Sequence, residues 1–143
     1  MPIDLPSGYE LCFAGNGMEP PAPREPTGSP RAMPVAAVVA AKPRDWRAPG
    51  GYGCFLSRRG AGELLDRGAR DGFAGDVDWR LVAYSLSRAD GEGLPPDGFA
   101  IGALRRHHAL IGADRPLAAY CFYPALPQPG RVGSVRKADN IVE

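Results

Sequence analysis

The segment at 52–86 constrains the fold most, because a strand, a helix cap and two helices follow one another directly within it. Its first residues, YGCFL, predict a short strand, and Ser57 follows where a hydroxyl can cap the helix expected over 58–72. A second helix is predicted over 76–86, where apolar residues recur at helical spacing and Asp76 suits the positive end of the helix. This succession of elements predicts an α/β fold.

The helix expected over 58–72 has an apolar face, although three glycines weaken it. Each glycine costs up to about 1 kcal/mol relative to alanine. Ala61, Leu64, Leu65 and Ala69 nevertheless fall at helical spacing. We therefore expect these four side chains to lie against a sheet.

Three further strands and one further helix are predicted. The run VAAVVAA (35–41) is rich in β-branched valine and has no polar alternation, which is typical of a strand covered on both faces. Further strands are expected over 8–15 and 117–123. A polar break at 87–98 separates the second helix from a short helix expected over 99–112.

Proline and length set the domain organisation. Six of the sixteen residues at 19–34 are proline, which removes backbone donors and predicts a surface loop outside the core. The polar tail at 130–143 is expected to be weakly ordered by itself. A chain of 143 residues suits one domain with one core, so a single domain is predicted over 1–143.

Charge and cysteine content argue against several classes of protein. The net charge of +1 gives no global reason to bind nucleic acid. Cys12, Cys54 and Cys121 lie far apart among apolar neighbours, so we expect three buried free thiols in a reducing compartment. No signal peptide is visible, and the longest apolar run, at 32–41, is about half of the roughly 20 residues that a membrane span needs.

Asp76 and Asp78 are the residues at which chemistry is most readily placed. Two carboxylates near a helix N-terminus can bind a hard cation, or one of them can act as a general base. An Asp-x-Asp sequence also arises by chance. From the residues alone, capping of the helix by one of the two is the favoured interpretation.

The sequence RRHH at 105–108 is the one local cationic cluster. It could meet phosphate or carboxylate groups on a saccharide acceptor or on a membrane surface, but a solvated helix face is the favoured interpretation. His107 and His108 are adjacent and point in different directions on a helix, so a metal ion shared by both is not expected.

The same segments resemble those of glycosyltransferase family 25 enzymes of the lipopolysaccharide-biosynthesis type. In that family a Gly-Tyr-x-hydrophobic-Ser-x-x-Gly-Ala-x-x-Leu-Leu strand and helix precede a Pro-Val-Asp-like motif, and here YGCFLSRRGAGELLDRG precedes DVDWRLVAYSL. LPSGYELCFAG (5–15) resembles an earlier strand of the family. LAAYCFYPALPQPGRVGSVR (117–136) resembles its closing strand with the proline, glutamine and serine that follow. The resemblance covers nearly the whole chain.

The resemblance also implies roles for individual residues. Asp78 matches the aspartate of the Pro-Val-Asp motif and is the implied catalytic residue, as a base or as a support for the metal ligands beside the acceptor sugar. The implied substrate-binding residues are Asp76, Trp79, Tyr52, Ser57, Gln128 and Ser134, and no metal ligand is implied in this chain. Stacking, capping and close helix packing are the stronger alternative for Tyr52, Ser57, Gly60 and Ala61. Gln128 and Ser134 stay open between contacting a ligand and pinning the tail.

The fold implied by the resemblance is the C-terminal part of a GT-A-like glycosyltransferase domain, a small mixed or mostly parallel sheet flanked by helices. The implied parent activity transfers a hexose, galactose or glucose, from a nucleotide diphosphate sugar to lipopolysaccharide or another surface glycan. Family members hold a divalent metal, Mn or Mg, with an acidic motif in their N-terminal half, and no such motif precedes residue 5 here. We therefore expect no complete metal site and no activity of this chain alone.

Several alternatives stay open at this point. The chain is a truncated transferase, a decayed fragment, or a half that assembles with a separate donor-binding chain, and the first two are preferred. A carbohydrate-binding or interaction module without catalysis, derived from the same fold, is the main functional alternative. The implied location is cytoplasmic, with peripheral contact at the inner face of a bacterial membrane left open.

Overall fold

The computed structural model of the chain describes residues 3–15, 30–41, 53–72, 76–95, 99–111, 115–123 and 125–126. The strands in these segments are β1 (Leu11–Phe13), β2 (Arg31–Pro34), β3 (Cys54–Leu56) and β4 (Ala119–Tyr123). The helices are α1 (Val35–Ala41), α2 (Arg58–Asp71), α3 (Val77–Tyr84), α4 (Arg88–Glu92) and α5 (Phe99–Leu110). The mixture of helices and strands confirms the expected α/β class.

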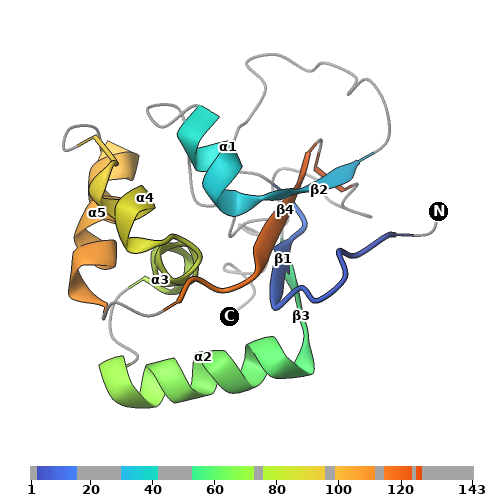
Figure 1. Cartoon of the computed structure of the whole chain (residues 1–143), viewed down its shortest axis with the longest axis horizontal. Helices are drawn as coiled ribbons and strands as arrows, with labels where there is room; N and C mark the ends of the chain where they lie inside the picture. Colours follow the sequence, from blue (N-terminus) through green and yellow to red (C-terminus); the bar gives the residue numbers. More distant parts are fainter. Residues whose placement is uncertain are drawn as a thin grey trace, which may run out of the picture.

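The four strands form one open sheet in the order β2-β4-β1-β3 (Figure 1). The central pair, β1 and β4, is parallel, with Leu11 opposite Ala119. Both outer strands run antiparallel to their neighbours, β3 against β1 and β2 against β4. The sheet is therefore mixed, as expected, with its only parallel pair among these strands at the centre.

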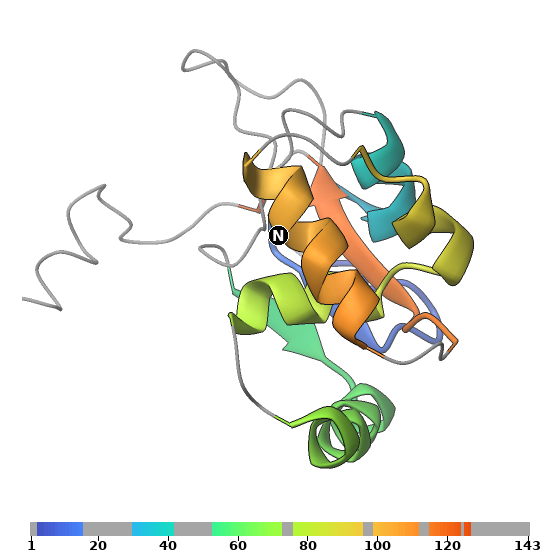
Figure 2. The same ribbon diagram turned by 90° about the vertical axis from the view of Figure 1, so that its left-hand side faces the viewer.

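The core lies between one face of this sheet and the helices. Leu11 and Phe13 of β1 and Ala119 and Cys121 of β4 alternate with residues that point to the other face, and all four belong to the buried cluster. Helices α1, α3, α4 and α5 gather on this same side of the sheet, with α5 in front of β4 in Figure 2. The cluster also includes the three valines of α1, Val82 of α3, and Ile101 and Leu104 of α5.

The strand predicted over 35–41 is wrong, because these residues form helix α1. Val35, Val38 and Val39 are the buried residues of this helix, and their spacing of three and four places them on one helical face. The remaining four residues are alanine, which has the highest helix propensity. The β-branched content suggested a strand, but the spacing of the valines and the alanines between them favour a helix.

Two further expectations are corrected around this region and beyond it. The loop predicted over 19–34 ends before residue 31, because 31–34 form β2, an edge strand in which a proline is tolerated. Residues 19–29 of that loop and the tail at 130–143 lie outside the described residues. The break predicted at 87–98 contains the short helix α4, capped by the hydroxyl of Ser87, which accepts from the Asp90 amide.

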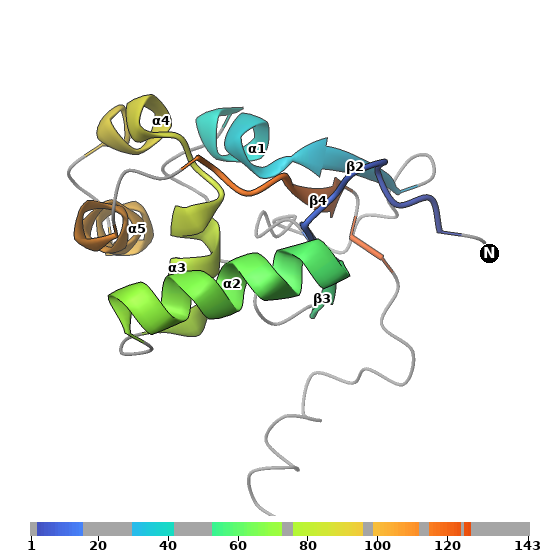
Figure 3. The same ribbon diagram turned by 60° about the horizontal axis from the view of Figure 1, so that its bottom comes forward.

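Helix α2 begins where the sequence predicts, because the Ser57 hydroxyl accepts a hydrogen bond of 2.9 Å from the Gly60 amide. The expected face of the helix is wrong in part, since Leu65 is 65% exposed and Ala69 is also exposed. The buried residues of α2 are instead Gly60, Arg67 and Gly68. Figure 3 shows α2 running from β3 to beyond α3.

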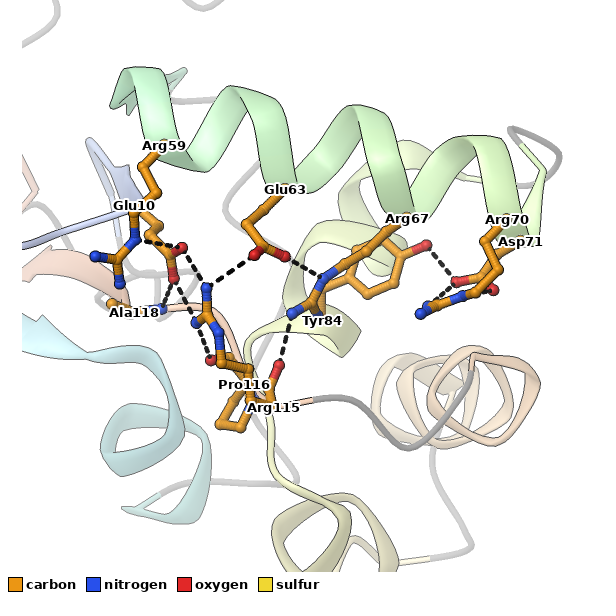
Figure 4. A network of polar contacts seen from close by, with 10 residues as sticks. All are labelled: Glu10, Arg59, Glu63, Arg67, Arg70, Asp71, Tyr84, Arg115, Pro116 and Ala118. Atoms are coloured by element: carbon orange, nitrogen blue, oxygen red, sulfur yellow. Dashed lines mark hydrogen bonds and ion pairs between the residues drawn. The ribbon is translucent and has the colours of Figure 1, made fainter.

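A buried carboxylate helps to explain why polar residues of α2, and not its expected apolar face, pack against the rest of the fold. Glu10, immediately before β1, is fully buried and accepts hydrogen bonds of 2.8 and 2.7 Å from Arg115 and one of 3.2 Å from Arg59 (Figure 4). Its side chain also accepts from the Ala118 amide at 2.8 Å. Arg115 hydrogen bonds, opposed in part by burial, lower the pKa of Glu10 to about 2. Helix α2 therefore contributes Arg59 to the neutralisation of this carboxylate, while Glu63 on the same helix accepts a further hydrogen bond of 3.1 Å from Arg115.

Gly60 makes the approach of α2 to β1 sterically feasible. A Cβ at this position would overlap the backbone carbonyl of Glu10, which also accepts from the Ser57 amide at 3.2 Å. Gly62, one half-turn further along the same helix, has nothing within 4 Å of a Cβ position. Of these two glycines, Gly60 is required by a close contact and Gly62 is not.

We predict opposite effects of alanine at these two glycines. Gly60→Ala should destabilise the fold by roughly 2 kcal/mol or more, because backbone must move to admit the methyl group. Gly62→Ala should stabilise it by about 0.5–1 kcal/mol through helix propensity alone. Urea unfolding of both variants measures the difference. Equal effects of the two substitutions would contradict a close contact between α2 and β1.

The lowered pKa of Glu10 predicts a pH dependence of stability. Because the folded-state pKa, about 2, lies below the ordinary value of 4.5, the stabilisation is present above about pH 4.5 and lost as pH falls toward 2. A shift of this size corresponds to on the order of 3 kcal/mol. Glu10→Gln should therefore lower stability at neutral pH and flatten its decline in acid, measured by thermal unfolding at a series of pH values.

Part of the acid dependence should remain in Glu10→Gln. Asp71 at the end of α2 also has its pKa lowered to about 2, chiefly by hydrogen bonds from Arg70 and with a further bond from the Tyr84 hydroxyl. An unchanged acid dependence in Glu10→Gln would show that the Glu10 carboxylate contributes little to folding.

Candidate functional site

The start of α3 holds the two aspartates that the sequence singled out. Asp76 is the capping residue, and its Oδ1 accepts a hydrogen bond of 3.0 Å from the Asp78 amide. Its backbone carbonyl accepts the first helical bond, from the Arg80 amide at 3.1 Å. Asp76 is exposed, so its described role is to begin the helix.

Asp78 lies in the first turn of α3 and is half-buried. Partial shielding of the Cys54 thiol from water, with a smaller contribution from the negative charge of Asp78, raises the pKa of that thiol although the residue as a whole is exposed. The start of α3 thus holds one half-buried carboxylate, that of Asp78, while the neighbouring Asp76 supplies the cap.

The other residues implied by the resemblance divide into three groups. Trp79 follows Asp78 on α3, is half-buried and packs against the core cluster. Ser57 uses its hydroxyl to cap α2 and follows the end of β3 opposite to Cys54. Tyr52, Gln128 and Ser134 lie outside the described residues. Asp76, Asp78 and Trp79 therefore share the start of α3 as neighbours in the sequence, and Ser57 has a separate structural role.

The three cysteines lie on neighbouring strands of the sheet. Cys12 and Cys121 are buried as expected, and burial raises the pKa of each thiol to about 12. Cys54 is exposed, which contradicts the expectation that all three would be buried. The reason is its place at the start of the edge strand β3, which has a neighbour on one side only. Raised pKa values keep these thiols protonated and make them poor nucleophiles.

A second polar site lies at the other end of α3, where a pocket of about 330 Å³ opens between helices. Its lining comes from α2, from the end of α3 with Leu86, from α4 and from α5 with Ile111. The charged and aromatic residues of this lining are Arg67, Tyr84, Arg88, Glu92, Arg105 and His108. The sequence indicated part of this site through the RRHH cluster, which supplies Arg105 and His108.

Sequence periodicity could not find the rest of the pocket. Arg67 comes from the middle of α2 and is buried, with its guanidinium 5.3 Å from the centre of the Tyr84 ring. Arg88 comes from α4, a helix that the sequence did not predict. These residues are brought to His108 only by the packing of α2 and α4 beside α5.

The two histidines of α5 make contacts with different parts of the chain. His107 Nδ1 lies 2.8 Å from the Ala103 carbonyl on its own helix. His108 Nε2 lies 3.4 Å from the Leu86 carbonyl, and its ring packs so closely on Gly91 that a Cβ there would overlap it. Among the described residues, no group of three or more His, Cys, Asp or Glu side chains could hold a metal ion.

No helix in the described segments is both long and apolar enough to cross a membrane. Comparisons with protein-family models, curated proteins and solved structures found no match for this chain.

Proposed function

We propose that this chain forms the acceptor side of a sugar-transfer site in a GT-A-like glycosyltransferase resembling family 25, and that Asp78 is its functional carboxylate. The parent reaction transfers a hexose from a nucleotide diphosphate sugar to a hydroxyl of lipopolysaccharide or another surface glycan. The observation that carries the proposal is the half-buried position of Asp78 in the first turn of α3, at a helix start that Asp76 caps.

The chemistry of transfer gives a carboxylate at this position a definite task. The acceptor hydroxyl gives its proton to a carboxylate oxygen of Asp78 as its own oxygen bonds to the anomeric carbon. The bond from that carbon to the nucleoside diphosphate breaks, and the diphosphate leaves with the electron pair. The positive end of α3 favours the charged form of a carboxylate in its first turn before the proton arrives.

Trp79 supports an assignment to acceptor binding. It follows Asp78 directly in the first turn of α3 and is half-buried, so part of its surface is accessible. An aromatic side chain with one apolar face and one polar edge suits a ligand that has both kinds of surface. A sugar ring is such a ligand.

Donor binding is not assigned to the described residues. In the family that the chain resembles, a divalent metal neutralises charge on the departing diphosphate. The described residues offer no set of ligands that fits such a metal, so no step is assigned to one here. The proposal is restricted to acceptor contact and proton acceptance by this chain.

The test compares two substitutions that each remove one charge and little volume. Acceptor binding is measured by calorimetry with lipopolysaccharide core oligosaccharides. Asp78→Asn should weaken binding by about tenfold, as expected for loss of a charged hydrogen-bond partner worth about 1.4 kcal/mol. Asp76→Asn is the matched control, because asparagine caps a helix about as well as aspartate, and its affinity should stay within about twofold of the original chain.

Two results would contradict the proposal. Absence of any oligosaccharide binding by the unmodified, folded chain would remove acceptor recognition altogether. Binding that is equally strong in the original chain and in Asp78→Asn would remove the role of the carboxylate and favour a carbohydrate-binding module without catalysis.

A further inference from the structure

The pocket between α2, α4 and α5 lies at the end of α3 opposite to Asp78, and its lining includes neither of the two aspartates. We propose that it is a separate binding site for a small phosphomonoester, such as the phosphate group of a phosphorylated sugar. The inference does not depend on the function proposed for Asp78, since it concerns different residues.

The charge of the lining favours an anion. The lining contains three guanidinium groups, those of Arg67, Arg88 and Arg105, and one carboxylate, that of Glu92. Arg88 and Glu92 form a pair at 3.6 Å, and their side chains are 73% and 71% exposed. An exposed helical pair of this kind is worth only about 0.3–0.5 kcal/mol, so a bound phosphate can readily take over Arg88.

Two of the arginines are held in place before any ligand arrives. Arg67 donates from Nε to Glu63 at 3.2 Å and from NH2 to the Arg115 carbonyl at 2.7 Å, while its plane lies over the Tyr84 ring (Figure 4). Arg105 donates from NH1 to the Leu94 carbonyl at 2.6 Å. A guanidinium carries five N–H donors, so the hydrogen bonds described for Arg67 and Arg105 do not use all the donors of either group. Groups fixed in this way lose little freedom on binding.

The geometry favours phosphate over carboxylate. A carboxylate has two oxygens in one plane and is satisfied by one bidentate arginine. A phosphomonoester presents three terminal oxygens in different directions and carries a charge of about −1.5 to −2 at neutral pH. Three arginines that arrive from three different helices, α2, α4 and α5, match the second arrangement.

The volume and the apolar walls of the pocket limit the size and polarity of the organic group attached to the phosphate. A volume of about 330 Å³ lies at the lower end of the range for small-molecule sites. Ala83, Leu86, Ala109 and Ile111 supply apolar wall beside the arginines. The pocket therefore suits one phosphate attached to a single small organic group, such as one sugar ring.

The experiment uses glucose 6-phosphate as the probe, with glucose and glucuronate as the uncharged and carboxylate comparisons. Binding to the whole chain is followed by calorimetry and by shifts of backbone amide resonances on titration. Glucose 6-phosphate should bind saturably and shift amides of α4 and of the last turns of α5. Glucose should not bind, and glucuronate should bind at least about tenfold more weakly, because it can engage fewer arginines.

Variants separate the pocket from general surface charge. Arg105→Gln and Arg88→Gln should each weaken binding of glucose 6-phosphate by about tenfold, as expected for loss of a charged hydrogen bond. Arg106→Gln is the matched control, since Arg106 is adjacent on α5, exposed and outside the lining, and it should change affinity by less than about twofold. Arg88 is exposed, so its substitution tests the pocket even where loss of the Arg105 bond to Leu94 disturbs the fold.

Three results would overturn the proposal. The first is absence of saturable binding of glucose 6-phosphate in the millimolar range. The second is an equal loss of affinity in Arg106→Gln and Arg88→Gln, which would indicate diffuse attraction to the surface. The third is tighter binding of glucuronate than of glucose 6-phosphate, which would assign the pocket to carboxylates.

Discussion

The buried carboxylate of Glu10 is the constraint on which the arrangement of the other elements depends. A charge removed from water is tolerated only where partners and hydrogen bonds replace its hydration. Here three partners come from two places in the chain: Arg59 from the first turn of α2, and Arg115 and the Ala118 amide from the segment that leads into β4. The hydrogen bonds to the Glu10 carboxylate therefore hold β1, α2 and the segment before β4 together at a single point.

The same requirement determines how α2 is attached and what it carries to the far side of the molecule. From Glu10 the polar contacts continue through Arg115 to Glu63 and then to Arg67, which lies over Tyr84 in the pocket lining (Figure 4). Helix α2 is thus held by its charged face, with Gly60 permitting close approach at one end. The price is an exposed Leu65, which the apolar pattern had placed against the sheet.

Local patterns predicted much of the fold, and non-local contacts account for the errors. Caps depend on a few adjacent residues, so Ser57 and Asp76 could be assigned to helix starts from sequence alone. The valines of α1 carry both a strand signal in their branching and a helix signal in their spacing, and the spacing agrees with the structure. The partners of Glu10 lie up to 108 residues away, at Ala118, and no local period records them. The arginines of the pocket come from separate helices, so for the same reason local patterns indicate only the part of it on α5.

A double-mutant cycle between Glu10 and Arg115 tests the anchoring role of the buried carboxylate most directly. The free energies of unfolding of Glu10→Gln, Arg115→Gln and the double variant are compared with that of the original chain. If the two side chains stabilise the fold through each other, the double variant loses less than the sum of the single losses, by about 1.5–3 kcal/mol. Additivity within about 0.5 kcal/mol would show that the two residues act independently, and the carboxylate would then not be what holds these elements together.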